Sequence, residues 1–181
     1  NHTVDVDSAA LTVRTAVRWY EVRRNSTTGA WTINQQSTYA PDTDYRWMAS
    51  IATDQAGNIA LGYSAASTTQ YPAVRYTGRL FTDTVSTLPQ TEVTMTVSLG
   101  AQTGSNRWGD YSMLGVDPQD GCTFWYTQEY NGASASLPWK TRIGSFKFAG
   151  CTPVSTGNLS GTVVNAANNN AIASAAVAAI S

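Results

Sequence analysis

Short segments that alternate between apolar and polar residues run along most of the chain. Alternation with a period of two, rich in β-branched and aromatic residues, predicts strands. We expect nine strands, at residues 14–24, 31–36, 46–53, 58–65, 71–81, 91–99, 107–116, 122–130 and 139–148. Clusters of Gly, Pro, Asn and Asp between them predict turns. No 3.6-residue periodicity competes within residues 1–150, so the pattern predicts an all-β fold.

Part of this pattern occurs twice. Tyr63 follows Asp54 at the same spacing at which Tyr126 follows Asp117. Units of about four short strands that recur at a period slightly above ~50 residues are typical of β-propeller blades. We therefore expect residues 1–151 to form about two and a half four-stranded blades of a partial β-propeller. A propeller needs at least about four blades, so the partners would include upstream blades of the same protein.

The composition changes after Cys151. Residues 152–157 are typical of a linker. Residues 158–181 are predicted to form two strands around an Asn-rich turn, as at the truncated start of a β-sandwich domain. The chain begins and ends within such patterns, and we expect it to be a piece of a longer secreted protein.

Charged residues are scarce, which limits the classes of partner. The chain is 13% charged and 42% hydrophobic, against about 25% charged for an ordinary globular protein. The net charge of -1 gives no broad attraction to nucleic acid. No apolar run approaches the ~20 residues of a membrane span. A low-charge chain rich in Thr, Ser, Trp and Tyr is typical of an extracellular all-β protein.

The two cysteines, Cys122 and Cys151, flank the last predicted hairpin. Paired positions of an antiparallel hairpin have a constant index sum. The pair Tyr130 and Lys140 sums to 270, and the two cysteines sum to 273, so the cysteines should be neighbours. A disulfide needs Cα atoms within about 7 Å, which such neighbours satisfy. We predict a disulfide; two separate core thiols are the alternative for a cytosolic protein.

A family resemblance rests on residues 108–112, 116–121 and 123–130, which read Trp-Gly-Asp-Tyr-Ser, Val-Asp-Pro-Gln-Asp-Gly and Thr-Phe-Trp-Tyr-Thr-Gln-Glu-Tyr. This series resembles secreted bacterial propeller proteins of the sialidase-like, BNR-repeat type. The turns at 54–57 and 117–121 look like degenerate Asp boxes, which are hairpin staples in that family. The tail from Gly157 is similar to the opening of a carboxypeptidase regulatory-like, Ig-type domain.

The resemblance implies a function outside the cell. We expect a non-catalytic scaffold or binding module of a larger secreted protein, for glycans or surface proteins. The alternative is a sialidase-like glycoside hydrolase whose active site is completed by missing blades. An accessory domain of a secreted protease is a second alternative.

Asp110 and Tyr111 are the first candidate site residues. They follow Gly109 in the second repeat, which has two more residues than the first between its Arg-Trp pair and its Asp turn. An irregular inner strand of a propeller would aim a carboxylate and a phenol at the central channel, as ligand contacts or as a Ca²⁺ ligand at Asp110. The alternative, which we favour, is a bulge whose Asp caps neighbouring backbone N–H groups. No other cofactor is expected.

Two Arg-Trp pairs, Arg46-Trp47 and Arg107-Trp108, open the predicted inner strands. Convergent arginines would clamp a ligand carboxylate, as in sialidases. The alternative, which we favour because repeated residues usually solve a repeated structural problem, is an arginine stacked on its tryptophan.

Asp110, Tyr111 and Glu129 supply the residue types of a sialidase-like catalytic set. A sialidase-type retaining mechanism uses a Tyr nucleophile, a Glu beside it and an Asp acid/base. Glu129 lies on a predicted outer strand, however, and the alternative is a solvent-facing side chain. Other chemistry lacks the required residues, since His2 is the only histidine and the two cysteines do not have zinc-ligand spacing.

Overall fold

The computed structural model describes residues 1–7, 13–153 and 161–173, and in these residues every regular element is a strand. The prediction of an all-β fold is confirmed. The described residues contain no helix with the length and apolar character needed to cross a membrane.

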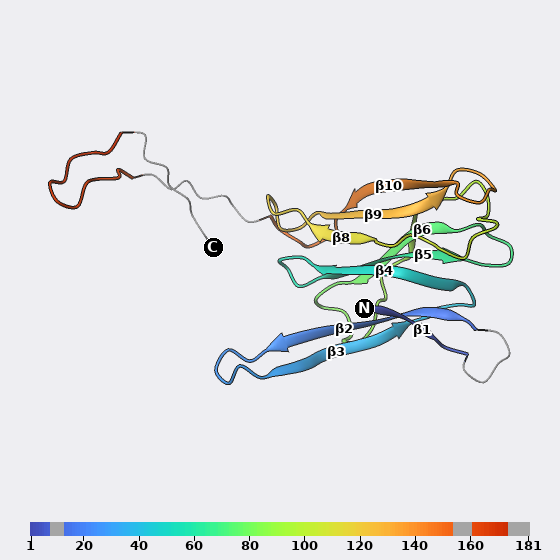
Figure 1. Ribbon diagram of the computed structural model, residues 1–181. Helices are drawn as coiled ribbons and strands as arrows, with labels where there is room; N and C mark the ends of the chain where they lie inside the picture. The colour runs from blue at the N-terminus through green and yellow to red at the C-terminus, as the bar shows by residue number, and fades with distance from the viewer. Residues whose placement is uncertain (8–12, 154–160, 174–181) are drawn as a thin grey trace.

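The strands form three antiparallel sheets (Figure 1). The first sheet has the order β1-β2-β3, with β1 at His2–Asp5, β2 at Thr15–Arg24 and β3 at Trp31–Tyr39. The second has the order β4-β5-β6-β7, at Tyr45–Thr53, Ile59–Ala66, Ala73–Arg79 and Val93–Val97. The third has the order β10-β9-β8, with β8 at Met113–Val116, β9 at Phe124–Asn131 and β10 at Trp139–Phe146.

The three sheets are stacked as layers, with the second sheet between the other two (Figure 1). Strand β5 explains this arrangement, because it is buried along nearly its whole length. Successive side chains of a strand point to opposite faces. Ile59, Leu61 and Tyr63 therefore pack against the first sheet, while Ala60 packs against the third.

Each interface between sheets has its own apolar core. The core between the first and second sheets includes Val17 and Trp19 of β2. The core between the second and third sheets includes Leu114 of β8 with Phe124 and Tyr126 of β9. These last three side chains define the inner face of the third sheet. Its outer face points away from the second sheet.

A hydrogen bond joins a hairpin turn of the second sheet, before β5, to one of the third sheet, before β9. Asp54, in the turn before β5, accepts hydrogen bonds from the backbone N–H groups of Ala56 and Asn58, both at 2.9 Å. Asp120 caps the turn before β9 in the same way. The hydrogen bond from the Thr123 hydroxyl, together with those from the backbone N–H groups of Thr123 and Cys122, lowers the pKa of Asp120 to about 2. Gln55 links the two turns, since its backbone N–H donates to the carbonyl of Gly121 at 2.9 Å.

The Cys122–Cys151 disulfide forms as predicted, with the two Cα atoms 5.7 Å apart. The hairpin register is also the predicted one, because Tyr130 pairs with Lys140. Cys122 is completely buried, and the bond ties the segment after β10 to the start of β9.

Two sequence predictions differ from the structure. The strand expected at 107–116 begins only at Met113, and residues 107–112 form no strand. The first sheet has a third strand, β1, where two strands had been expected.

In the tail, residues 161–173 contain one isolated bridge, between Val164 and Ala171, around the Asn-rich turn. The rest of the expected tail strands lies outside the described residues.

Strand β4 carries a bulge that reaches the third sheet. Its register with β5 shifts between Trp47 and Ser50, and Met48 has a φ of 49°, in the left-handed region that non-glycine residues seldom occupy. The Met48 carbonyl accepts hydrogen bonds from the Ser112 hydroxyl at 2.9 Å and from the Gln128 amide at 2.8 Å. These two contacts hold the bulge against the approach to β8.

Candidate functional site

Arg46 lies in the interior of the protein and not in an open cleft. Its side chain is completely buried. The guanidinium donates to both oxygens of Asp42, at 2.7 and 2.8 Å, and to Glu92. It lies over the rings of Tyr39 and Tyr63, with its central carbon 5.4 and 5.7 Å from the ring centroids. The stacking expected on Trp47 is therefore made on two tyrosines.

Arg75 completes this group around the buried Arg46, which we call the Arg46 cluster: Asp42, Asp44, Arg46, Arg75 and Glu92. Arg75 donates to Asp44 at 3.1 Å and to Glu92 at 2.6 Å. The cluster ties β6 and the segments before β4 and β7 together. All its charges are paired within the protein, so it has a structural role.

The charges of the Arg46 cluster change the pKa values of its acids. The hydrogen bond from Arg46 lowers the pKa of Asp42 to about 2. Burial by itself would raise the pKa of Glu92. The hydrogen bond from Tyr63 and the charges of Arg46 and Arg75 outweigh burial, and the pKa of Glu92 lies below its ordinary value. Both carboxyls are therefore held in the charged form.

Trp47 and Trp108 contact one another edge to face, with ring centroids 5.6 Å apart. The Trp108 indole N–H donates to the Ser64 hydroxyl of β5 at 3.1 Å. This contact anchors the 107–112 segment on the second sheet. The two tryptophans predicted as ligand contacts thus pack between sheets, and Arg46 and Arg107 do not converge on one ligand carboxylate.

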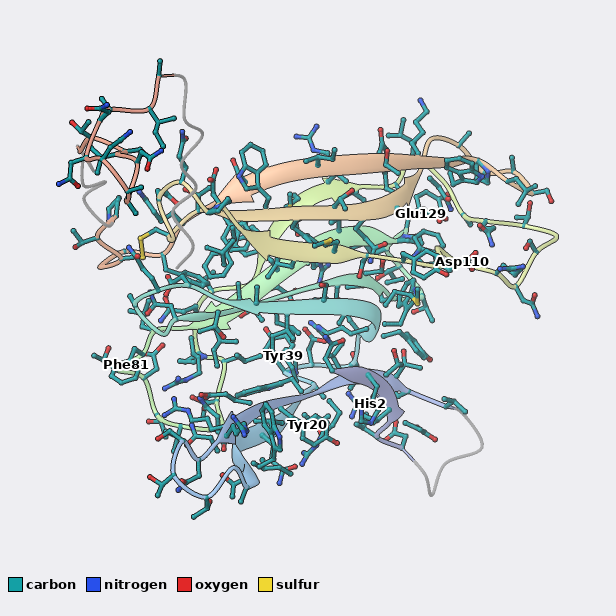
Figure 2. The ribbon with its side chains drawn as sticks, turned by 60° about the vertical axis from the view of Figure 1, so that its left-hand side comes forward. His2, Tyr20, Tyr39, Phe81, Asp110 and Glu129 are labelled. Atoms are coloured by element: carbon teal, nitrogen blue, oxygen red, sulfur yellow. A yellow bond between two sulfur atoms is a disulfide. The ribbon has the colours of Figure 1, made fainter. Side chains whose placement is uncertain are left out.

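The remaining predicted residues lie together in one open cleft of about 550 Å³. Figure 2 shows Asp110 and Glu129 at the same end of the third sheet. The residues that line the cleft come from the 99–112 segment, the loop before β10, and strands β9 and β10: Gln102, Ser105, Arg107, Gly109, Asp110, Tyr111, Thr127, Gln128, Glu129, Leu137, Trp139 and Thr141. Asp110 and Tyr111 also line a neighbouring cleft of about 300 Å³ with His2 and Met48.

A backbone contact also holds the 107–112 segment across this end of the sheet. The N–H of Gly109 donates to a Glu129 carboxylate oxygen at 2.9 Å. Gly109 has a φ of 30°, and a Cβ there would lie 3.1 Å from the same oxygen. A glycine therefore allows the backbone to approach Glu129 closely. We had favoured a bulge in which Asp110 caps neighbouring backbone N–H groups. Among the described residues the Asp110 carboxylate accepts no backbone hydrogen bond. It forms an ion pair with Arg107 at 2.7 Å instead.

Glu129 is half-buried on the outer face of the third sheet. Loss of hydration raises the pKa of its carboxyl above the ordinary value, and the negative charge of Asp110 adds to this increase. The hydrogen bond from Gly109 acts in the opposite direction but is outweighed. The cleft thus holds two neighbouring carboxyls, one of which takes up a proton more readily than a free glutamate does.

Two exposed aromatic side chains, Trp139 and Tyr111, line this cleft. Trp139 begins β10, its register places it on the same face as Glu129, and it is 59% exposed. Tyr111, which had been predicted, is 89% exposed. The hairpin register gave a signal for Trp139, since Thr141 pairs with Glu129 and Trp139 lies two residues before it. Gln102 comes from a distant loop, for which the sequence offers no such signal.

Among the described residues, no three His, Cys, Asp or Glu side chains are grouped so that they could hold a metal ion. Comparison of the chain with protein-family models, with curated proteins and with solved structures found no match. The function is therefore inferred from the geometry of the cleft.

Proposed function

We propose that the three sheets are consecutive blades of a β-propeller of the sialidase-like type. The support comes from their edge strands. Strands β1, β4 and β8 each form an edge of their sheet and come first in it along the chain, and β4 contacts both β1 and β8. Blades that are stacked around a central axis, each with its first strand innermost, have this arrangement.

The outer face of the third sheet supports the presence of a further blade. Met113, Trp125 and Ile143 lie on this face and are 65%, 47% and 64% exposed. Neighbouring apolar side chains left in water on one sheet face favour an interaction surface. A structure of the full-length protein tests the proposal: another sheet of the same protein should cover these three residues and leave the end of the face with Glu129 and Trp139 open. A solvent-facing surface over Met113, Trp125 and Ile143 would contradict it.

We further propose that the cleft binds carbohydrate and that this part of the protein is a non-catalytic binding module of a secreted protein. One observation carries the proposal: exposed Trp139 and Tyr111 side chains share the cleft with Asp110, Glu129 and Arg107. Aromatic rings offer flat apolar surfaces to sugar rings, and charged groups bind hydroxyls by strong hydrogen bonds. The disulfide supports an oxidising, extracellular location.

Two matched tryptophan variants test the binding proposal. Trp139 and Trp31 are both exposed and both begin a strand, β10 and β3, but only Trp139 lines the cleft. A glycan array identifies oligosaccharides that bind. Titration calorimetry should then show that Trp139→Ala lowers their affinity by about tenfold or more and that Trp31→Ala leaves it unchanged. Binding that is unchanged by Trp139→Ala, or equally weakened by both variants, would contradict the proposal.

A glycoside hydrolase is the second candidate, because the raised pKa of Glu129 beside Asp110 is the environment of a general acid. A sialidase-like carboxylate clamp has less support: Arg46 is buried, and Arg107 is the one arginine among the described residues that line the cleft. Hydrolysis of an aryl glycoside by the full-length protein, abolished by both Glu129→Gln and Asp110→Asn, would favour the hydrolase. Sugar binding without turnover would favour the module.

A further inference from the structure

The charges in the cleft are unequal, and this bears on which sugars it would accept. Arg107 and Asp110 are paired at 2.7 Å, with their side chains 76% and 63% exposed, so they largely neutralise one another. Glu129 has no cationic side chain within salt-bridge distance among the described residues. At neutral pH the cleft therefore contains one uncompensated negative charge, at a fixed position.

The Glu129 carboxylate also has unused capacity to accept hydrogen bonds. Among the described residues, its only hydrogen bond comes from the Gly109 N–H to Oε2. An ionised carboxylate offers about four acceptor positions on its two oxygens. A half-buried carboxylate that receives one hydrogen bond gains free energy when a ligand supplies more donors, and gains most when the donor is a cation.

The position of Glu129 relative to the aromatic residues fits a ligand with a ring and an amine. Thr141 of β10 pairs with Glu129 of β9 in the hairpin register. Trp139 lies two residues before Thr141 in β10, on the same face of the sheet. Trp139 and Glu129 are thus diagonal neighbours on adjacent strands, and such neighbours are about 7–8 Å apart, roughly the width of one sugar ring. A ring against Trp139 would thus present its substituents to Glu129.

We propose that the cleft prefers sugars with a free ammonium group, such as oligomers of glucosamine, over their N-acetylated and acidic counterparts. This inference rests on the proposed carbohydrate binding and adds a class of ligand to it. The ammonium group would donate to the free oxygen of Glu129 while the ring lies against Trp139. An acidic sugar would bring a second negative charge to Glu129 and Asp110, and one arginine already engaged by Asp110 would not compensate for it.

Three tetrasaccharides of equal length test the inference by titration calorimetry at low ionic strength: fully deacetylated chitotetraose, N-acetylchitotetraose and cellotetraose. We expect the deacetylated oligomer to bind about fivefold to tenfold more tightly than the other two, as one partly desolvated ion pair provides. Salt should reduce the difference. Glu129→Gln should abolish this difference in affinity between the deacetylated oligomer and the other two. Glu21→Gln, which alters a partly buried carboxylate on β2, should leave the preference intact.

The outcomes separate the inference from the proposed function. If all three oligomers bind equally, or if sialyllactose binds more tightly than any of them, the inference is overturned and carbohydrate binding stands. If the preference for the deacetylated oligomer persists in Glu129→Gln, the assignment to Glu129 is overturned. If neither these nor any other sugars bind to the full-length protein, the proposed function itself fails.

Discussion

The Arg46 guanidinium donates two hydrogen bonds to one oxygen of Glu92, at 3.2 and 2.9 Å, although the two residues are 46 positions apart in the chain. Glu92 precedes β7, and Arg46 lies near the start of β4, so this pair connects the two edges of the second sheet. Tyr63 of β5 donates its hydroxyl to the same oxygen. Glu92 is therefore the centre of the Arg46 cluster.

Substitution Glu92→Gln should destabilise the protein by about 2–4 kcal/mol. The amide removes a negative charge and leaves the completely buried Arg46 and the nearly buried Arg75 partly uncompensated. Urea unfolding followed by tryptophan fluorescence measures the change. Glu129→Gln is the matched control: its carboxylate is disfavoured by burial, so we expect a change within about 0.5 kcal/mol. Equal effects of the two substitutions would contradict a structural role of the cluster.

Acid should weaken the same cluster. The pKa of Asp42 is about 2 and that of Glu92 is lowered, whereas unfolded carboxyls titrate near about 4. Because the unfolded chain then binds protons more readily than the folded one, the stabilisation is complete above about pH 5 and is lost as the pH falls from about 4 to 2.

Unfolding free energies at pH 7, 5, 4 and 3 test this expectation. Wild type should lose stability between about pH 5 and 3, and Asp42→Asn, which starts from a lower stability at pH 7, should lose less over the same interval. Equal losses in both proteins would show that Asp42 does not contribute to the acid response.

Much of the fold could be predicted from local alternation, and the failures have a physical cause. Large and small side chains alternate within residues 58–65, which predicts β5, and the hairpin index sum predicts the disulfide, because both depend on near neighbours. The 107–112 segment was predicted as the first part of a strand, but a strand also needs a partner for its hydrogen bonds. Strand β8 pairs with β9 only as far as Met113 with Thr127, and beyond this point the Gly109 N–H bonds to Glu129 instead.

The candidate site was predictable to a smaller extent. Asp110, Tyr111 and Glu129 were identified by residue type and do share one cleft. The burial of Arg46 was not predictable, because its partner Glu92 lies in a distant part of the chain. The repeated Arg-Trp pair suggested the same environment for both arginines, and this was wrong. Arg46 is completely buried, whereas Arg107 is exposed. Arg46 lies within strand β4, whereas the backbone at Arg107 forms no strand, so the two equivalent sequence positions have different surroundings.

Removal of the disulfide by Cys122→Ala with Cys151→Ala should lower the free energy of unfolding by about 3.5 kcal/mol. The bond spans 29 residues, and closing a loop of this length removes a corresponding conformational entropy from the unfolded chain. Guanidinium unfolding of the double variant and of the wild type under non-reducing conditions measures the difference. Mass spectrometry of the non-reduced protein serves as the control, and two free thiols in the wild type would contradict the prediction.

Gly62 sets the distance between the second and third sheets. It lies on β5, and a Cβ added there would lie 2.5 Å from the ring of Tyr126 on β9, well inside contact distance. Tyr126 is completely buried, and the Gln128 amide donates to its hydroxyl at 3.2 Å, so the ring has little freedom to move aside. Gly62→Ala should therefore push the sheets apart and destabilise the protein by about 1–3 kcal/mol, with a loss of near-ultraviolet circular dichroism from the tyrosine.

Gly115 of β8 provides the matched control for this substitution. It is also a glycine within a strand, but the nearest atom to an added Cβ, on Met113, is 3.9 Å away, an ordinary contact. Gly115→Ala should leave the free energy of unfolding within about 0.5 kcal/mol of the wild type, or raise it, because alanine restricts the unfolded chain more than glycine does. Urea unfolding of the two variants side by side separates the causes. A similar loss of stability in both would mean that the substitutions act through strand flexibility, and that close packing of Gly62 on Tyr126 does not hold the third sheet in place.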